Sequence, residues 1–361
     1  MIHSFSDFEA ALPAERIQRR GPQSFLLQAY SETDREAFRL DCGWENTADH
    51  PETLQLQIDW PSIPFSELRD CFYWKSELDA DWSPIFGQTS PGKSFLSWQL
   101  PPGRGILSLH PYYGCCDLEH YLATLPAEQV DVQTFGHSAH HRPLRVLSLG
   151  QTGAPVILIT ARNHANETSG NYCVEGMLNW LLSSAPLARY SLEHFHFMLV
   201  PITNPDGVAE GMARYTAPNG ADLNRTPEWQ QKNCPDFEGD PVLTACYELF
   251  QGLKPAIFLN LHSYLFKFKD QIMAPDEDFL QRFTTFMPDQ TEAGKTWYRS
   301  ITDQRDFPTG WCAQRFGTMP ILLEIPWFMR NVKNMRQTGA KIIQALLLAQ
   351  SLEGPSVWGK L

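Results

Sequence analysis

Residues 155–184, PVILITARNHANETSGNYCVEGMLNWLLSS, decide the fold class of this chain. They begin with an uninterrupted apolar segment of strand length and end with a helix-like segment. This succession is typical of a largely parallel sheet that helices cover on both faces. His164 and Glu167 stand between the two segments, where the strand should end. Ligands of such sheets bind beyond the carboxyl ends of the strands, so polar residues at these ends are candidates for a site.

Further segments of both kinds follow the same pattern through the rest of the chain. Apolar segments of strand length occupy residues 144–150, 195–202, 256–262 and 319–325. Helix-like segments lie among them, for example PVLTACYELFQGL and DEDFLQRFTTFM. We therefore predict an α/β domain over residues 112–361, with a doubly wound, mixed and mostly parallel sheet and helices on both faces.

The N-terminal part of the chain has a different pattern of apolar and polar residues. Segments such as ETLQLQIDW and KSFLSWQL alternate apolar and polar residues, and Pro and Gly separate them. Alternation with period two between turn residues indicates antiparallel strands. We predict a small antiparallel β domain over residues 1–111, with no cluster of His, Cys and carboxylates that suggests chemistry.

Composition excludes several classes of function. The chain has 361 residues, 43% of them hydrophobic, and a net charge of -12. An acidic surface argues against nucleic acid and anionic membranes as partners. No segment is long and apolar enough to span a bilayer, and the N-terminal stretch MIHSFSDFEAALPAERIQRR lacks the apolar core of a secretory signal. We expect a cytoplasmic protein, and the sequence does not indicate its oligomeric state.

The eight cysteines form no CxxC pair, and we expect reduced thiols. Cys115 and Cys116 are adjacent, so a metal or redox role remains the alternative to ordinary packing there.

The pair His164 and Glu167 has two interpretations. If both residues lie at the start of the helix, a spacing of three puts them on one face, where an imidazole and a carboxylate can bind one zinc ion. The alternative is a carboxylate that the helix dipole favours, beside an incidental histidine. A third metal ligand would have to come from a distant part of the sequence.

Two other strand ends offer complementary groups. His262 follows the apolar segment AIFLNL, and Glu324 interrupts the apolar segment MPILLEI. A carboxylate within a buried strand needs a partner, a raised pKa or a cleft, which suits a general base. The alternatives are a core histidine and a Glu324 that pairs with Arg315.

The loop TNPDGVAEGMARYTAPNGADLNR, residues 203–225, follows another predicted strand. It contains Arg214 and, next to Asn224, Arg225. Guanidinium groups at a sheet crevice can bind a carboxylate or an oxyanion. The alternative is a solvated connection.

Together these residues suggest a zinc hydrolase. One Zn²⁺ would bind His164, Glu167 and His262 and leave a fourth position for water, whose pKa zinc lowers to about 7. Glu324 would accept the proton of that water, and Arg214 would stabilise the oxyanion. Asn224 and Arg225 would bind a free carboxylate of the substrate.

The sequence resembles the zinc carboxypeptidases of the funnelin type, and within them the cytosolic carboxypeptidase branch. The matching motifs, in the order of the family, are His164-x-x-Glu167, Asn204-Pro205-Asp206-Gly207, Asp222-Leu223-Asn224-Arg225, His262-Ser263-Tyr264 and Glu324. The resemblance implies zinc ligands at 164, 167 and 262, a general base at 324, and an Asp222 that orients the first histidine. It also implies a tyrosine that caps the substrate, for which Tyr298 is the candidate, and a peptide or protein C-terminus as substrate.

Two alternative functions remain open. Zinc deacylases of N-acyl amino acids, of the succinylglutamate desuccinylase and aspartoacylase type, share the HxxE, the distant His and the DLNR loop. A non-catalytic binding protein on the same fold is the second alternative, although all the expected ligands, the base and the arginine are present. For the N-terminal β domain, shaping the entrance to the site and self-association are both open.

Overall fold

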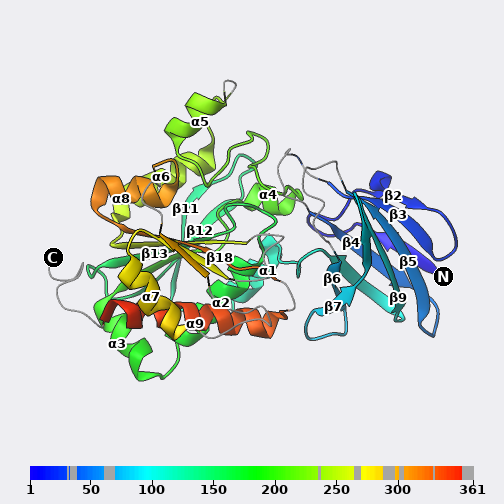
Figure 1. Ribbon diagram of the computed structural model, residues 1–361, viewed down its shortest axis with the longest axis horizontal. Helices are drawn as coiled ribbons and strands as arrows, with labels where there is room; N and C mark the ends of the chain where they lie inside the picture. Colours follow the sequence, from blue (N-terminus) through cyan, green and yellow to red (C-terminus); the bar gives the residue numbers. More distant parts are fainter. Residues whose placement is uncertain are drawn as a thin grey trace.

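The computed structural model describes residues 1–30, 32, 39–60, 70–234, 237–263, 270–287, 297–300, 305–327 and 330–351. Two bodies lie side by side along the long axis of the molecule (Figure 1). The first, here called the N-terminal β region, comprises residues 2–108 and contains two five-stranded sheets. The first sheet has the order β1 (Ile2–Phe5), β4 (Asp41–Asn46), β10 (Gly103–Ser108), β6 (Cys71–Ser76), β7 (Ser83–Phe86). The second has the order β2 (Ile17–Arg19), β3 (Ser24–Gln28), β5 (Glu52–Asp59), β9 (Lys93–Leu100), β8 (Gln88–Ser90), and a 3₁₀ turn, Ala14–Arg16, precedes β2.

The alternation seen in the sequence places one face of each sheet in a shared core. In β5, Leu54, Leu56 and Ile58 are buried and pack in one cluster with Trp44 of the other sheet. Apolar residues with period two therefore form the inner faces of a sandwich. The described strand pairs of this region are antiparallel except β3 with β5, which are parallel.

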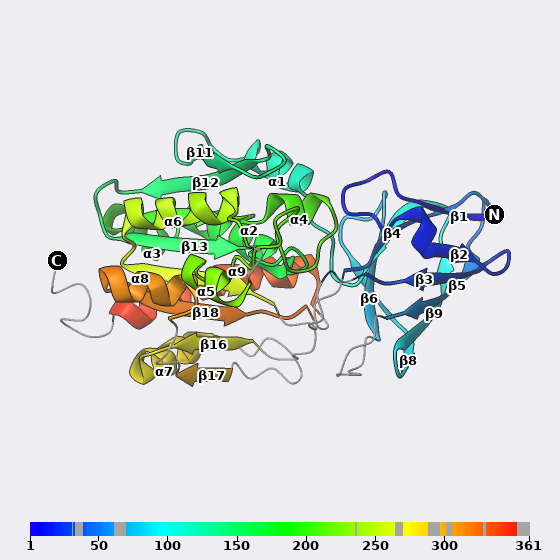
Figure 2. The same cartoon turned by 90° about the horizontal axis from the view of Figure 1, so that it is seen from above.

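The second body is built on an eight-stranded sheet, whose edge-to-edge succession of strands is visible in Figure 2. Its order is β11 (Asp131–His137), β12 (Pro143–Gly150), β14 (His196–Val200), β13 (Val156–Ala161), β15 (Ile257–His262), β18 (Met319–Glu324), β16 (Gln271–Ala274), β17 (Trp297–Ser300). The four central strands, β14, β13, β15 and β18, run parallel, as do β16 and β17, and the other neighbours are antiparallel. From β13 the chain crosses first to β14 on one side and later to β15 on the other, which makes the sheet doubly wound.

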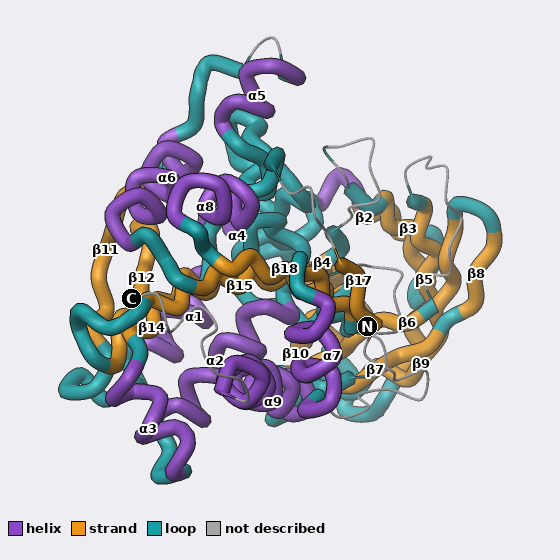
Figure 3. Tube along the Cα trace, turned by 60° about the vertical axis from the view of Figure 1, so that its left-hand side comes forward, coloured by secondary structure: helices purple, strands orange, loops and turns teal. Residues whose placement is uncertain are grey.

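Helices cover both faces of this sheet (Figure 3). One face carries α2 (Ser169–Leu181), α3 (Pro186–His194), α7 (Glu277–Phe286) and α9 (Val332–Ser351). The other side carries α4 (Pro205–Ala209), α5 (Pro227–Asn233), α6 (Pro241–Leu253) and α8 (Pro308–Phe316). The helix α1 (Cys115–Leu122) comes between β10 and β11 in the chain. The predicted fold class, a mixed and mostly parallel sheet with helices on both faces, is confirmed.

Each central strand contributes to the core on both of its faces. Ile157 and Ile159 of β13 pack in the cluster that includes residues of α2 and α9, whereas Leu158 packs in the cluster that includes residues of α6 and α8. Because successive side chains point to opposite faces, a strand covered on both sides has no polar face, which explains its uninterrupted apolar sequence.

Two glycines allow close packing of α2 on α9. A Cβ added at Gly176 would lie 1.8 Å from the carbonyl oxygen of Arg336, and one at Gly339 would lie 2.0 Å from that of Cys173. No side chain fits at either position, so the backbones of the two helices approach each other directly. This contact fixes α2, which follows directly after a polar turn, against α9.

The last strand of the N-terminal β region, β10, ends at Ser108, and the next element, α1, begins at Cys115. The boundary at residues 111 and 112 falls in this interval and stays a prediction. Among the helices of the described ranges, none combines the length and the apolar character that crossing a membrane requires.

Candidate functional site

Parallel pairing brings the carboxyl ends of β13, β15 and β18 to one edge of the sheet. Leu261 is the register partner of Ala161, and His262 is the register partner of Glu324. His262 and Glu324 are therefore neighbours across two strands although they are far apart in the sequence. Both are buried, with 1% and 6% of their surface exposed.

His164 and Glu167 lie in the turn between β13 and α2, and not at the start of the helix, the position at which they would share a helical face. The helix begins at Ser169 with Thr168 as its N-cap. The Glu167 N–H donates to the His164 carbonyl at 3.2 Å, which closes a four-residue turn. The spacing of three still brings the two side chains together, but through this turn and not through a helical face.

His164, Glu167 and His262 form one compact group of possible metal ligands. The Nδ1 atoms of His164 and His262 lie 2.9 Å from Oε1 and 2.8 Å from Oε2 of Glu167, respectively. One ligand atom from each of the three residues lies within 4.8 Å of the others, and all three side chains are buried. Two imidazole nitrogens and one carboxylate that converge in this way suit a divalent zinc ion.

Charge in this group favours an ionised Glu167 and a neutral His262, the forms of these two residues that bind a metal. Burial raises the pKa of Glu167, but the two imidazoles outweigh burial and hold that pKa well below its usual range. Burial lowers the pKa of His262, which favours its neutral form. Burial and Arg214 lower the pKa of His164, but Glu167 and Asp222 outweigh them and raise it. The surrounding carboxylates therefore favour a positive charge at this position, which a bound cation would supply.

Asp222 connects the ligand group with Arg214. Its Oδ1 lies 3.2 Å from His164 Nε2 and accepts the backbone N–H of Asn224 at 3.0 Å. Its Oδ2 accepts from Nε and Nη2 of Arg214 at 3.0 and 2.8 Å. Burial raises the pKa of Asp222, but His164 and Arg214 outweigh it and hold the pKa far below its usual range. In the neutral ring, an ionised carboxylate on Nε2 favours the tautomer with its proton there, which leaves Nδ1 available to a metal.

A chain of amides holds Asn224. Thr160 of β13 and Asn260 of β15 are register partners, and the Thr160 hydroxyl donates to Asn260 Oδ1 at 2.9 Å. Asn260 Nδ2 in turn donates to Asn224 Oδ1 at 3.2 Å. Since its oxygen accepts this bond, Asn224 presents its Nδ2 donors elsewhere, an orientation that suits an acceptor such as a carboxylate.

Arg225 is held by two aromatic rings and by the carbonyl of the preceding residue, Asn224. Its guanidinium carbon lies 4.6 Å from the ring centroid of Phe307 and 5.3 Å from that of Trp229. Its Nη1 donates to the Asn224 carbonyl at 2.8 Å. Arginine between aromatic rings loses little freedom when it binds an anion.

Arg315, which the sequence offered as a partner of Glu324, lies elsewhere. Arg315 contacts Glu228 at 3.6 Å on the surface and lies over the ring of Trp311. The alternative in which Arg315 pairs with Glu324 therefore does not agree with the contacts of Arg315. Arg305 is exposed. Tyr298 lies in β17 opposite Ile272, and its side chain lies outside the described part of the structure, as does Tyr264.

Two residues near the candidate ligands, Arg162 and Asn260, were not predicted from the sequence. Arg162 adopts a positive φ of 59° and is completely buried. Its Nε and Nη2 donate to the Ala165 carbonyl at 2.9 and 2.6 Å, and its Nη1 donates to Asn171 Oδ1 and to the Tyr113 carbonyl. The sequence contains no signal for this role, because an arginine at a strand end is common. Asn260 does carry a signal, because it is a polar residue within an apolar strand.

A second group, His140, Asp206 and Glu210, also has its ligand atoms within 4.8 Å. Arg142 Nη1 already contacts Asp206 Oδ1 at 2.7 Å and Glu210 Oε1 at 3.3 Å. Asp206 also accepts from the Ser138 hydroxyl at 2.7 Å. The guanidinium of Arg142 thus already contacts both carboxylates of this group, and we assign Asp206 of the NPDG motif to holding the loop in place.

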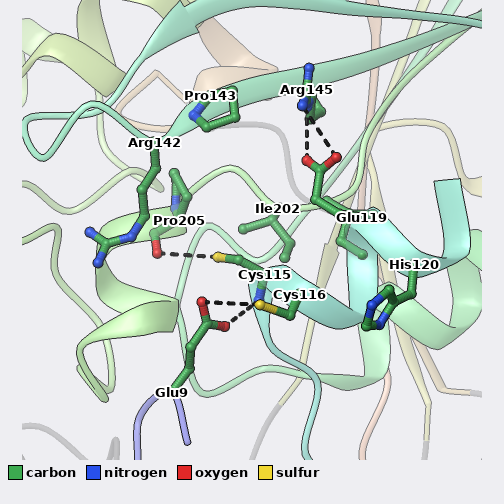
Figure 4. Close-up of a pocket in the computed structure, with 11 residues that line it drawn as sticks. Glu9, Cys115, Cys116, Glu119, His120, Arg142, Pro143, Arg145, Ile202 and Pro205 are labelled. Carbon is green, nitrogen blue, oxygen red and sulfur yellow. Dashed lines mark hydrogen bonds and ion pairs between the residues drawn. The ribbon is translucent and has the colours of Figure 1, made fainter. Parts of the chain in front are cut away.

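The adjacent cysteines line a separate cavity of about 460 Å³ beside α1 (Figure 4). Burial raises the pKa of Cys115 to about 12, and the nearby Glu9 carboxylate raises that of Cys116. Raised pKa values keep both thiols protonated at neutral pH, which disfavours nucleophilic and metal-ligand roles. All eight cysteines are free thiols.

Comparisons with known proteins agree with this geometry. The family model of zinc carboxypeptidases matches residues 117–267, a segment that contains His164, Glu167, Asp222 and His262. Cytosolic carboxypeptidase 1 of Mus musculus is 40% identical over 115 residues, which are 30% of this chain and 9% of that protein. Cytosolic carboxypeptidase 6 of Mus musculus is 34% identical over 117 residues, 30% of this chain and 22% of that protein. The chain thus spans a minor part of these relatives.

Among solved structures, a metallo-carboxypeptidase from Burkholderia cenocepacia superposes with a TM-score of 0.81 at 18% identity. The match covers 97% of this chain and 99% of that chain. The two proteins therefore share a fold that extends through the N-terminal β region as well as the α/β body.

Proposed function

We propose that the protein is a zinc-dependent metallocarboxypeptidase that hydrolyses the C-terminal peptide bond of peptides or protein tails. The match of residues 117–267 to the family model of zinc carboxypeptidases supports this proposal. The observation that carries the proposal is the convergence of His164 Nδ1 and His262 Nδ1 on the two oxygens of Glu167. In this proposal His164, Glu167 and His262 hold one Zn²⁺. A zinc ion held there would supply Lewis acidity and would lower the pKa of a bound water to about 7.

Glu324 is the proposed general base. Its strand position beside His262 supports this role, because it brings a buried carboxylate next to the ligand group. The carboxylate accepts the proton of the attacking water and returns it to the leaving amine. A buried, water-poor setting strengthens such a transfer.

Arg214, Asn224 and Arg225 have distinct proposed tasks. Arg214 donates to the oxyanion that develops on the scissile carbonyl, and its two bonds to Asp222 hold the guanidinium in place for that purpose. Asn224 and Arg225 bind the free carboxylate of the substrate, a role that the donor orientation of Asn224 supports. Tyr298 is the proposed capping tyrosine, on the resemblance alone. The names of the matching relatives support a cytoplasmic location.

The test uses zinc-loaded protein and a panel of peptides that vary in their last two residues, with N-acyl amino acids in parallel. We expect release of C-terminal amino acids from peptides and none from N-acyl amino acids. Deacylation alone would instead favour the deacylase alternative. Glu324→Gln should bind one zinc per chain and lose kcat by about 10²-fold or more, in the range for a general base. Undiminished turnover of this variant would exclude Glu324 as the base, and binding without turnover by the unaltered protein would favour a binding module.

A further inference from the structure

The N-terminal β region supplies a carboxylate to three consecutive backbone N–H groups near the candidate site. Glu32 Oε2 accepts from the N–H of Ala213 at 2.8 Å. Its Oε1 accepts from the N–H of Arg214 and from that of Tyr215, the latter at 2.9 Å. Successive N–H groups that point at one anion form a concave site of positive potential, and an ionised carboxylate is a strong acceptor for it.

Two more contacts from the same region reach the same loop, residues 207–215, here called the arginine loop. The N–H of Ala10 donates to the Ala209 carbonyl at 2.9 Å. The buried Arg39, which Asp41 holds at 2.6 Å, donates to the Val208 carbonyl at 3.0 Å. The N-terminal β region thus contacts the arginine loop near its beginning and at its end.

The arginine loop in turn contacts the ligand group by two routes. The Asn166 N–H, in the turn between His164 and Glu167, donates to the Ala213 carbonyl at 3.0 Å. The Arg214 side chain holds Asp222, which contacts His164 Nε2. A displacement of residues 213–215 would therefore move the guanidinium of Arg214, whereas the turn that carries two of the proposed ligands keeps its hydrogen bonds from Arg162 to the Ala165 carbonyl.

We propose that Glu32 is a positioning residue, which acts through Arg214, and that the N-terminal β region holds the arginine loop in its catalytic conformation. The inference rests on the proposed function for its catalytic consequence. Without the carboxylate, water would satisfy the three N–H groups and the loop would sample more conformations. Arg214 would then meet the developing oxyanion in the correct geometry less often, so kcat would fall while ground-state binding changes less.

The first experiment compares Glu32→Ala with Glu15→Ala, a matched loss of an exposed glutamate in the same region. We expect kcat to fall about tenfold in Glu32→Ala, with KM and the zinc content close to those of the unaltered protein. Glu15→Ala should leave all three unchanged. A kcat of Glu32→Ala within twofold of the unaltered value would refute the catalytic role.

A double-mutant cycle with Arg214→Ala separates positioning from a general structural effect. If Glu32 acts through Arg214, Glu32→Ala should lower kcat less than about twofold when Arg214 is already absent. An equal loss in both backgrounds would overturn the proposal, because it would mean that Glu32 acts independently of Arg214.

Hydrogen exchange tests the contact without reference to activity. The amides of residues 213–215 should exchange about tenfold faster in Glu32→Ala than in Glu15→Ala. If the unaltered protein hydrolyses no substrate, the proposed function fails, and the exchange result alone still decides whether Glu32 holds the loop. Unchanged exchange at these amides would refute that contact whatever the activity.

Discussion

Replacing Asp222 by asparagine tests how strongly zinc binding at the proposed ligands depends on the negative charge of Asp222, which contacts His164. The carboxylate is 3% exposed and makes four contacts, with His164, with two nitrogens of Arg214 and with the Asn224 N–H. The substitution keeps the size of the side chain and removes the charge. Oδ1 of the new amide can still accept from Asn224 and His164, but its NH₂ group would then face the guanidinium of Arg214.

Both orientations of that amide are unfavourable. In the one that retains Oδ1, Arg214 loses two charge-assisted hydrogen bonds while its side chain remains only 15% exposed. In the reversed one, an N–H points at His164 Nε2, which moves the ring proton to Nδ1, the atom that faces Glu167. Removing a hydrogen-bond partner of a metal-binding histidine typically weakens metal binding about 10- to 100-fold. We expect the Kd for zinc to rise by that factor, about 1.4 to 2.7 kcal/mol.

Competition with a chromophoric chelator measures the zinc affinity, and urea unfolding of the metal-free protein measures stability. We expect Asp222→Asn to lose about 3 kcal/mol of unfolding free energy, because it leaves a buried arginine without its partner. Asp206→Asn is the matched control, because Asp206 is 1% exposed and also paired with an arginine, Arg142, at 2.7 Å. It should lose similar stability and keep its zinc affinity. Equal zinc affinity in Asp222→Asn and the unaltered protein would refute the orienting role.

Two further predictions concern Asn224 and the adjacent cysteines. Asn260→Asp puts an acceptor where Asn260 donates to Asn224 Oδ1. Asn224 should then turn its NH₂ group toward the new carboxylate and its oxygen toward the substrate, so KM for peptides with a free C-terminus should rise about tenfold or more. Thr160→Val is the control, because it leaves the Asn260 donor in place. An unchanged KM in Asn260→Asp would contradict the claim that Asn260 orients Asn224. Glu9→Gln removes the negative charge that raises the pKa of Cys116, so its thiolate fraction and its rate of alkylation at pH 8 should increase. Mass spectrometry of the labelled peptide measures that rate, and a slower reaction in the variant would contradict the assigned cause.

The strand ends were predictable from the sequence for a physical reason. Strands buried on both faces must be apolar throughout, so a polar residue within or directly after one is conspicuous. His262 and Glu324 were found in this way, and the parallel register then makes them neighbours. Asn260 carries the same sign, and reasoning from its polarity would have found it as well.

Local geometry was less predictable than element type. A spacing of three between His164 and Glu167 fits both a helical turn and a four-residue turn outside a helix, and the sequence does not distinguish them. The difference arises from Arg162, whose buried guanidinium binds the Ala165 carbonyl and whose φ of 59° redirects the chain at the end of β13. Only the surrounding packing holds a residue without glycine's freedom in this conformation.

Contacts between distant segments were beyond the reach of sequence patterns. Glu32 and Arg214 are 182 residues apart, and a glutamate in a polar stretch has no periodic context that would mark it. The change of sequence pattern divides the chain at residues 111 and 112, yet Ala10 and Arg39 donate hydrogen bonds to the loop at residues 208 and 209, and Glu32 accepts them from residues 213–215. A chain that began at residue 112 would leave three successive N–H groups and two carbonyls of the arginine loop to water. A change in sequence pattern can therefore mark where one core ends and another begins without marking a boundary of function.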